Sequence, residues 1–147
     1  MKPPIKHIFL ADDDCDDVDF FQFVLESVRP GSNLTVFSNG QELVDALHAT
    51  TEIPDFIFLD INMPFMSGLE ALKIIKELPK LASVPVIVYS TSANAMDVER
   101  AMQLGAGSYV VKPSNLKDLE KIIARILDTD WTSVVHPHEL ESFVLRG

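Results

Sequence analysis

Short apolar runs alternate along the chain with segments in which apolar residues recur at helical spacing. The runs cover residues 8–11, 34–37, 56–59, 86–89 and 109–111. Apolar runs of this length are typical of strands that are buried on both faces of a sheet. The helical segments cover roughly residues 16–29, 40–49, 67–78, 94–104 and 115–128. Five strands alternating with five helices predict an α/β fold with a parallel, doubly wound sheet and helices on both of its faces.

Capping residues support two of the helix boundaries. Ser67 is followed three positions later by Glu70, a pattern that favours the start of the third helix at Ser67. Gly105 follows the fourth helical segment, where a glycine commonly ends a helix.

Composition and charge narrow the function classes. The chain has 147 residues, which is enough for one domain with a buried core. Twelve Lys and Arg against 22 Asp and Glu give a net charge of −10, which argues against a nucleic acid as the main partner. There is no apolar stretch of the ~18 residues that a membrane span needs, no secretory signal pattern, and a single cysteine, Cys15. We therefore expect a cytoplasmic protein without disulfides.

Polar and charged residues follow the apolar runs at the points where strands are predicted to end. The first run leads into Asp12-Asp13-Asp14, the third into Asp60, the fourth into Ser90 and the fifth into Lys112-Pro113. Ligands bind at the carboxyl ends of the strands in a doubly wound sheet. Carboxylates gathered at one edge repel each other unless a cation neutralises them, and their hard oxygen atoms favour Mg²⁺ or Mn²⁺.

A structural explanation covers some of these acids. Acidic residues at the start of a helix often act as caps or as partners of the helix dipole, which accounts for Asp16, Asp17 and Asp19 but not for Asp60, and leaves Asp14 undecided. A calcium-binding EF-hand loop beginning at Asp12 is excluded, because its glycine position is Asp17 and its terminal glutamate position is Phe23.

The segment D-I-N-M-P-F-M-S-G at 60–68 resembles the phosphoacceptor segment of response-regulator receiver domains. The acidic pair Asp12-Asp13, the hydroxyl of Ser90 and Lys112-Pro113 lie where that family has such residues, and Tyr109 supplies an aromatic three positions before the lysine. The resemblance covers about residues 5–128 and implies a flavodoxin-like fold.

By this resemblance, Asp60 is the nucleophile that accepts a phosphoryl group from a histidine kinase or a histidine phosphotransfer protein. Asp13, Asp60 and the backbone carbonyl of Asn62 would hold Mg²⁺, with Asp12 binding it directly or through water. In-line phosphoryl transfer depends mainly on positioning and charge neutralisation, which a cation and Lys112 would supply.

The resemblance also implies a switch. Ser90 and Lys112 would bind the phosphoryl oxygens, Tyr109 would turn inward, and the Lys112–Pro113 bond would be cis. Ser90 is chosen over Thr91 because it ends the apolar run directly, whereas Thr91 would point to the opposite side of an extended chain. Such a receiver catalyses only its own phosphorylation and dephosphorylation and is not an enzyme acting on another substrate.

Phe23 is the predicted docking residue for the kinase. At about 100° per residue it lies off the core stripe of the first helix. The downstream target is not identifiable from the sequence, and we expect a monomer or weak homodimer with neither nucleic acid nor membrane as a partner.

The remaining residues, 129–147, are predicted to form a C-terminal extension to a stand-alone receiver. They contain several apolar residues, and Pro137 favours a short helix over 139–145. We expect this extension to pack on its own domain rather than on another copy.

Three other readings compete. A phosphohydrolase of the haloacid dehalogenase type expects a hydroxyl or apolar residue four positions after its nucleophile, whereas Asp12 is followed there by Asp16. A flavodoxin-like electron carrier needs a phosphate-cradling loop after the first strand, where this chain is acidic. A phosphorylation-independent interaction module of the same fold is the third reading, and the competent residues at every catalytic position count against it.

Overall fold

The computed structural model describes residues 7–131 and 143–147. The strands are β1 (His7–Ala11), β2 (Asn33–Phe37), β3 (Phe56–Leu59), β4 (Val86–Ser90), β5 (Ser108–Val111) and β6 (Val144–Leu145). The helices are α1 (Cys15–Val28), α2 (Gly40–Ala49), α3 (Gly68–Glu77), α4 (Ala95–Gln103) and α5 (Leu116–Asp128), with a short 3-10 helix at Pro79–Leu81. None of the helices in these ranges is long and apolar enough to cross a membrane.

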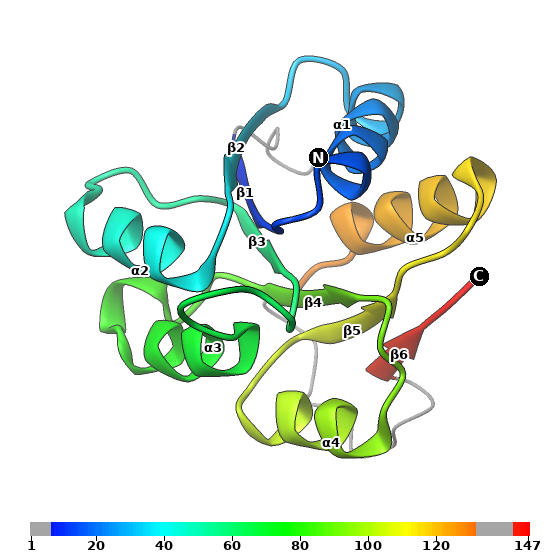
Figure 1. Ribbon diagram of the computed structural model, residues 1–147. Coiled ribbons are helices and arrows are strands. Elements are labelled where there is room, and N and C mark those ends of the chain that lie inside the picture. Colours follow the sequence, from blue (N-terminus) through cyan, green and yellow to red (C-terminus); the bar gives the residue numbers. More distant parts are fainter. Residues whose placement is uncertain (1–6, 132–142) are drawn as a thin grey trace.

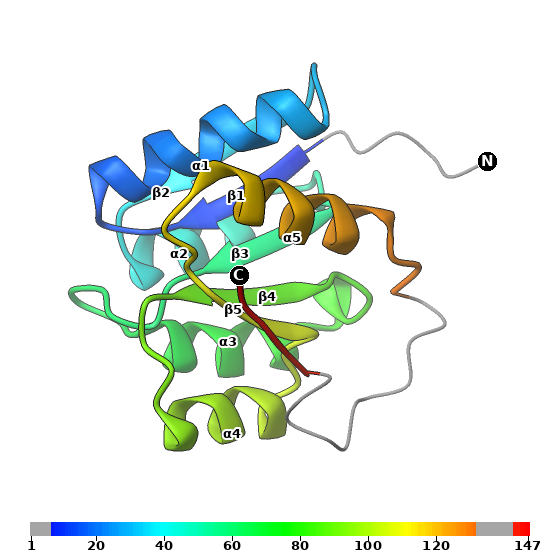
Figure 2. The same cartoon turned by 90° about the vertical axis from the view of Figure 1, so that its right-hand side faces the viewer.

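The strands form one parallel sheet in the order β2-β1-β3-β4-β5-β6. Helices α1 and α5 cover one face, and α2, α3 and α4 cover the other (Figures 1 and 2). The predicted doubly wound α/β architecture is therefore confirmed. The prediction of five strands is wrong by one, because β6 adds a short sixth strand beside β5.

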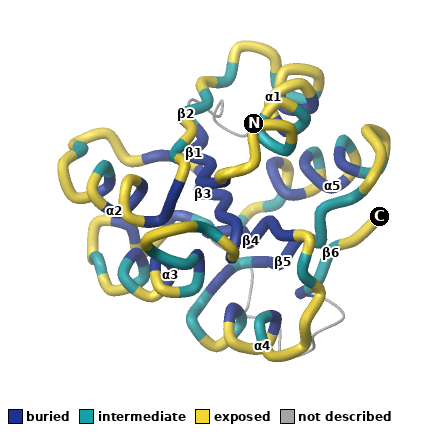
Figure 3. Tube along the Cα trace, viewed as in Figure 1, coloured by how far each residue is buried: buried dark blue, intermediate teal, exposed yellow. Residues whose placement is uncertain are grey.

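The core consists of two apolar layers, one on each face of the sheet. One includes Leu43 of α2, Leu72 of α3 and Val98 of α4, and the other includes Phe21 of α1 and Ile123 of α5. Central strands are apolar on both faces because both faces are covered, as the dark blue strands in the middle of Figure 3 show. Polar side chains that could bind a ligand therefore lie at the strand ends.

Capping residues fix the starts of α1 and α3 and the end of α4. Asp14, whose role the sequence left undecided, is the N-cap of α1, and its carboxylate accepts hydrogen bonds from the backbone N–H groups of Asp16 and Asp17. Ser67 caps α3 by accepting from the N–H of Glu70 at 3.2 Å, as predicted. Gly105 ends α4 with a φ of +96°, which a glycine adopts without steric cost.

The end of the chain differs from the predicted helix over 139–145. Residues 139–142 lie outside the described residues, and Val144–Leu145 form a strand instead. The physical reason is the edge of β5, whose backbone groups need partners. Phe143 is fully buried, and the Ser108 hydroxyl donates a hydrogen bond of 2.6 Å to its carbonyl. These last residues thus pack on their own domain.

The bond between Lys112 and Pro113 is trans, so the predicted cis bond is wrong. The trans form is favoured by about 0.5–1 kcal/mol in X-Pro bonds. Here a bend at 114–115 carries the chain from β5 into α5 with a trans bond.

Candidate functional site

Backbone hydrogen bonds bring Asp12 and Asp60 together at the carboxyl end of the sheet. The N–H of Asp12 donates to the carbonyl of Phe37 at 2.9 Å, and the N–H of Asp60 donates to the carbonyl of Ala11 at 2.9 Å. These bonds continue the pairing of β1 with its neighbours by one residue. The first acid after each of two adjacent strands is therefore held by the sheet rather than by a mobile loop.

Three carboxylates form a cluster at this edge. Asp12, Asp13 and Asp60 each offer an oxygen atom, and these atoms lie within 4.8 Å of one another. Asp12 and Asp60 are buried, with 2% and 7% of their surface exposed, whereas Asp13 is exposed. A partly open set of hard oxygen donors fits a divalent cation such as Mg²⁺ or Mn²⁺. Asn62 is exposed in the loop that follows Asp60.

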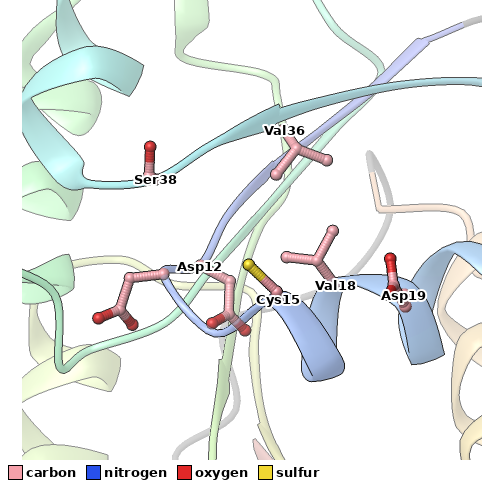
Figure 4. A pocket seen from close by; sticks show the side chains of 7 residues that line it. Asp12, Cys15, Val18, Asp19, Val36 and Ser38 are labelled. Carbon is pink, nitrogen blue, oxygen red and sulfur yellow. The ribbon is translucent and has the colours of Figure 1, made fainter.

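A cavity of about 270 Å³ lies beside this cluster (Figure 4). It is lined by Asp12 and Asp13, by Cys15 and Val18 at the start of α1, and by Val36 of β2, among others. Two of the three clustered carboxylates, Asp12 and Asp13, line this cavity, whereas Asp60 does not.

The ammonium group of Lys112 reaches into the cluster from the end of β5. Its Nζ lies 2.8 Å from Oδ2 of Asp12, 2.7 Å from Oδ2 of Asp17 and 3.2 Å from Oδ2 of Asp60. Burial by itself would lower the pKa of Lys112, but its contacts with these carboxylates outweigh burial and raise the pKa. The group is therefore a permanent cation at neutral pH.

Asp12 is the most deeply buried acid of the site, with 0% of its side chain exposed. Burial raises its pKa above the ordinary value, and Lys112 offsets this only in part. Four carboxylates, of Asp12, Asp13, Asp17 and Asp60, lie near one ammonium group, and this excess of acidic groups favours the binding of a further cation.

The ring of Tyr89 closes the site beneath Lys112. The Lys112 Nζ lies 5.1 Å from the ring centroid, within the range of a cation–π contact. Tyr89 is fully buried on β4 against Phe21, and burial raises the pKa of its hydroxyl. The sequence offered Tyr89 only as the last residue of an apolar run, so its place beside the charged cluster was missed.

Ser90 and Tyr109 lie on the side of the site formed by β4 and β5. Ser90 is fully buried, and its Oγ accepts a hydrogen bond from the N–H of Ser92 at 3.3 Å, whereas Thr91 is exposed. Tyr109 is also fully buried, and its hydroxyl donates to the carbonyl of Ser92 at 2.8 Å. The two side chains are thus linked to the same short segment after β4.

Asp17 is the acid whose position differs most from the sequence interpretation. The sequence predicts that it is a partner of the helix dipole, but its carboxylate makes the shortest of the three Lys112 contacts. Asp17 lies in the first turn of α1, which begins at Cys15, and no spacing in the sequence shows that its side chain points toward Lys112.

Phe23 is 63% exposed, as its helical spacing predicts, while Phe21, Val24 and Leu25 form the buried face of α1. It does not belong to the carboxylate cluster. Its predicted role in docking a kinase stays a prediction.

Gly68 packs directly against the backbone of Asp60. A Cβ atom at Gly68 would overlap the carbonyl oxygen of Asp60 and would lie 2.9 Å from the Cα of Ile61. We expect Gly68→Ala to reduce the free energy of unfolding by about 2 kcal/mol, because the first turn of α3 must move away from the loop. Denaturant unfolding measures this effect. A loss of less than about 0.5 kcal/mol, as is usual for a surface substitution, would contradict the close contact.

Residues 8–124 match the family model described as the response regulator receiver domain. The chain is 34% identical over 137 residues to the response regulator Rcp1 of Synechocystis sp., covering 90% of this chain and 92% of that protein.

Two solved structures share both fold and sequence with the chain. The crystal structure of the phosphorylated cyanobacterial phytochrome response regulator RcpA has a TM-score of 0.76 and 32% identity, covering 90% of this chain and 99% of that one. The Mn²⁺-bound form of Rcp1 has a TM-score of 0.75 and 32% identity with the same coverage. The match of the family model and the match to Rcp1 over nearly its whole length establish that the chain belongs to the family of response regulator receiver domains, which act in two-component signalling.

Proposed function

We propose that Asp60 accepts a phosphoryl group, with Mg²⁺ as the resident cation, and that this reaction switches the protein between two signalling states. The observation that supports this most directly is the place of Asp60: a buried carboxylate that shares one strand edge with two further carboxylates and with the ammonium of Lys112. The phosphorylated relative RcpA supports the same reaction.

The reaction follows from the groups present. An oxygen of the Asp60 carboxylate attacks the phosphorus of a phosphohistidine, the P–N bond breaks, and the electron pair leaves with the imidazole of the donor. The product is an acyl phosphate on Asp60. Lys112 offers a fixed positive charge and Ser90 a hydroxyl donor to the phosphoryl oxygens, and such preorganised charge is a major source of catalysis in phosphoryl transfer.

Asp13, Asp60 and the carbonyl of Asn62 are the proposed ligands of the cation, with Asp12 binding it directly or through water. The cation would neutralise charge on the transferred group and help align it. Rcp1 has been solved with Mn²⁺, and we propose Mg²⁺ here because Mg²⁺ is typically held by one or two carboxylates together with waters and phosphate oxygens.

Ser90 and Tyr109 are the proposed output elements. A phosphoryl group that binds the Ser90 hydroxyl would shift the segment after β4. Tyr109 donates a hydrogen bond to the carbonyl of Ser92 in that segment. Contacts made in only one state shift a two-state equilibrium toward that state. We propose that the surface around α4, β5 and α5 responds in this way.

The proposed phosphoryl donor is a histidine kinase or a histidine phosphotransfer protein, which docks on α1 near the exposed Phe23. The proposed location is the cytoplasm. The chain would modify only itself and would act on a downstream protein as a monomer or weak homodimer, and its charge of −10 disfavours a nucleic acid in that role.

Incubation of the protein with acetyl phosphate tests the proposal. We expect intact-mass spectrometry to show one added phosphoryl group with Mg²⁺ and essentially none with excess EDTA, because the carboxylate cluster repels the anionic donor when no divalent cation is bound. Beryllofluoride binding in the presence of Mg²⁺ serves as a second measurement that does not depend on the lifetime of the acyl phosphate. If neither an adduct nor beryllofluoride binding occurs with Mg²⁺, the protein is a phosphorylation-independent interaction module.

A further inference from the structure

We infer that Asp17 is a positioning residue that competes with the phosphoryl group for the ammonium of Lys112, and so sets how far the phosphorylated state is favoured. This inference rests on the proposed function of Asp60. The carboxylate of Asp17 lies 2.7 Å from the Lys112 Nζ, and its side chain is 31% exposed.

Carboxylates already surround Lys112 without a phosphoryl group. Its Nζ donates hydrogen bonds to Asp17 at 2.7 Å and to Asp60 at 3.2 Å. The Oδ2 of Asp12 lies 2.8 Å away as an ion-pair partner without hydrogen-bond geometry. The ring of Tyr89 occupies another side at 5.1 Å, and only 6% of the lysine side chain is exposed. A phosphoryl oxygen that approaches Lys112 therefore competes with carboxylates that already hold its ammonium group.

The three carboxylates differ in what a cation does to them. Asp12 and Asp60 belong to the carboxylate cluster that fits a divalent cation, so a bound cation would neutralise them and weaken their attraction for Lys112. Asp17 is not a member of that cluster, so its attraction for Lys112 would be weakened less by a bound cation. Asp60 loses its carboxylate charge when it takes the phosphoryl group. Asp17 is thus the carboxylate that would continue to compete with the phosphoryl group for Lys112.

Asp17 is free to act in this way because it is not needed to start the helix. Asp14 caps α1 by accepting from the N–H groups of Asp16 and Asp17 through its own carboxylate. The side chain of Asp17 is therefore available to Lys112, and an isosteric substitution leaves the cap in place.

Asp17→Asn is expected to move two affinities in opposite directions. Mg²⁺ should bind about threefold to tenfold more weakly, because Lys112 then pairs only with the carboxylates that the cation needs and one negative charge is lost nearby. Beryllofluoride, a mimic of the phosphoryl group, should bind about threefold to tenfold more tightly at saturating Mg²⁺, because its binding no longer has to break the ion pair between Lys112 and residue 17. Titration calorimetry of the full chain measures both.

Asp16→Asn is the matched control, since it removes the same charge from the same helical turn and no contact joins the Asp16 side chain to Lys112. It should change each affinity less than about twofold, as expected for an exposed charge in salt. Equal effects of the two substitutions, or a shift of both affinities in one direction in Asp17→Asn, would overturn the role of Asp17 while leaving the proposed function intact. Failure of the unsubstituted protein to bind beryllofluoride with Mg²⁺ would overturn the proposed function and this inference together.

Discussion

Asp60→Asn is expected to abolish phosphorylation by acetyl phosphate. The amide has nearly the same shape as the carboxylate but is not a nucleophile under these conditions. The backbone of residue 60 stays anchored by its hydrogen bond to the carbonyl of Ala11, so the fold should be retained. Intact-mass spectrometry should show no phosphoryl adduct at a donor concentration that modifies most of the unsubstituted protein.

Asp45→Asn is the control for this experiment, because Asp45 lies on the exposed side of α2, hydrogen-bonded to Gln41 and remote from the strand edge. It should be phosphorylated to the same extent as the unsubstituted chain. An adduct that survives in Asp60→Asn would show that another residue accepts the group and would contradict the assignment of Asp60.

Lys112→Met is expected to have the second largest effect. It should lower the free energy of unfolding, and the size of this loss should depend on whether Mg²⁺ is bound. Removing one partner of a buried ion pair leaves the other charge uncompensated, which typically costs about 3–5 kcal/mol. Asp12, with 0% of its side chain exposed, is the acid that loses most. Without divalent cations, the free energy of unfolding should therefore fall by an amount near the lower end of that range, since Asp17 remains partly solvated.

Mg²⁺ should restore much of this stability, because it replaces the lost positive charge among the same carboxylates. Lys112→Met should accordingly bind Mg²⁺ about tenfold more tightly than the unsubstituted protein, although it loses the contact to the phosphoryl group. Denaturant unfolding with and without Mg²⁺ measures both effects.

The loss of stability in Lys112→Met should also depend on pH. Burial raises the pKa of Asp12 in the folded protein, and loss of Lys112 should raise it further. An acid whose pKa is higher in the folded state binds more protons there, so stability falls as pH rises through the interval between the unfolded and folded pKa values. The difference in the free energy of unfolding between the unsubstituted protein and Lys112→Met should therefore become smaller at acidic pH, where Asp12 is protonated.

Lys76→Met provides the control for loss of a partly buried lysine. Burial lowers the pKa of Lys76, and its Nζ donates to the carbonyl of Val84 at 3.4 Å and contacts no carboxylate within residues 7–131 and 143–147. Its substitution should cost little stability and should not respond to Mg²⁺. Identical responses of the two lysine variants to Mg²⁺ would contradict the account of Lys112.

The sheet, the five principal helices and the edge that carries the site were predictable from the sequence. Apolar runs such as 56–59 and 86–89 are buried on both faces, and the burial requires helices on each side. Because parallel strands end at one edge, the residues after them meet there, which is why Asp12 and Asp60 could be expected together.

The features that were missed depend on tertiary contacts. An acidic residue in the first turn stabilises a helix through the helix dipole whichever way its side chain points. Only the path of α1 over the sheet therefore shows that Asp17 reaches Lys112. The short strand β6 likewise depends on the free edge of β5 and on the buried Ser108 hydroxyl, both of which are distant in sequence from Val144. The trans bond before Pro113 was mispredicted because the resemblance suggested cis, a form that X-Pro bonds adopt at a cost of only about 0.5–1 kcal/mol.

The most direct test of the central claim is to locate the phosphoryl group on the chain. The protein is phosphorylated with acetyl phosphate and Mg²⁺, treated with borohydride, which reduces an aspartyl phosphate to homoserine, and digested for peptide sequencing by mass spectrometry. We predict homoserine at residue 60 and at no other position. Homoserine at Asp12, Asp13 or another acid, with residue 60 unchanged, would contradict the account.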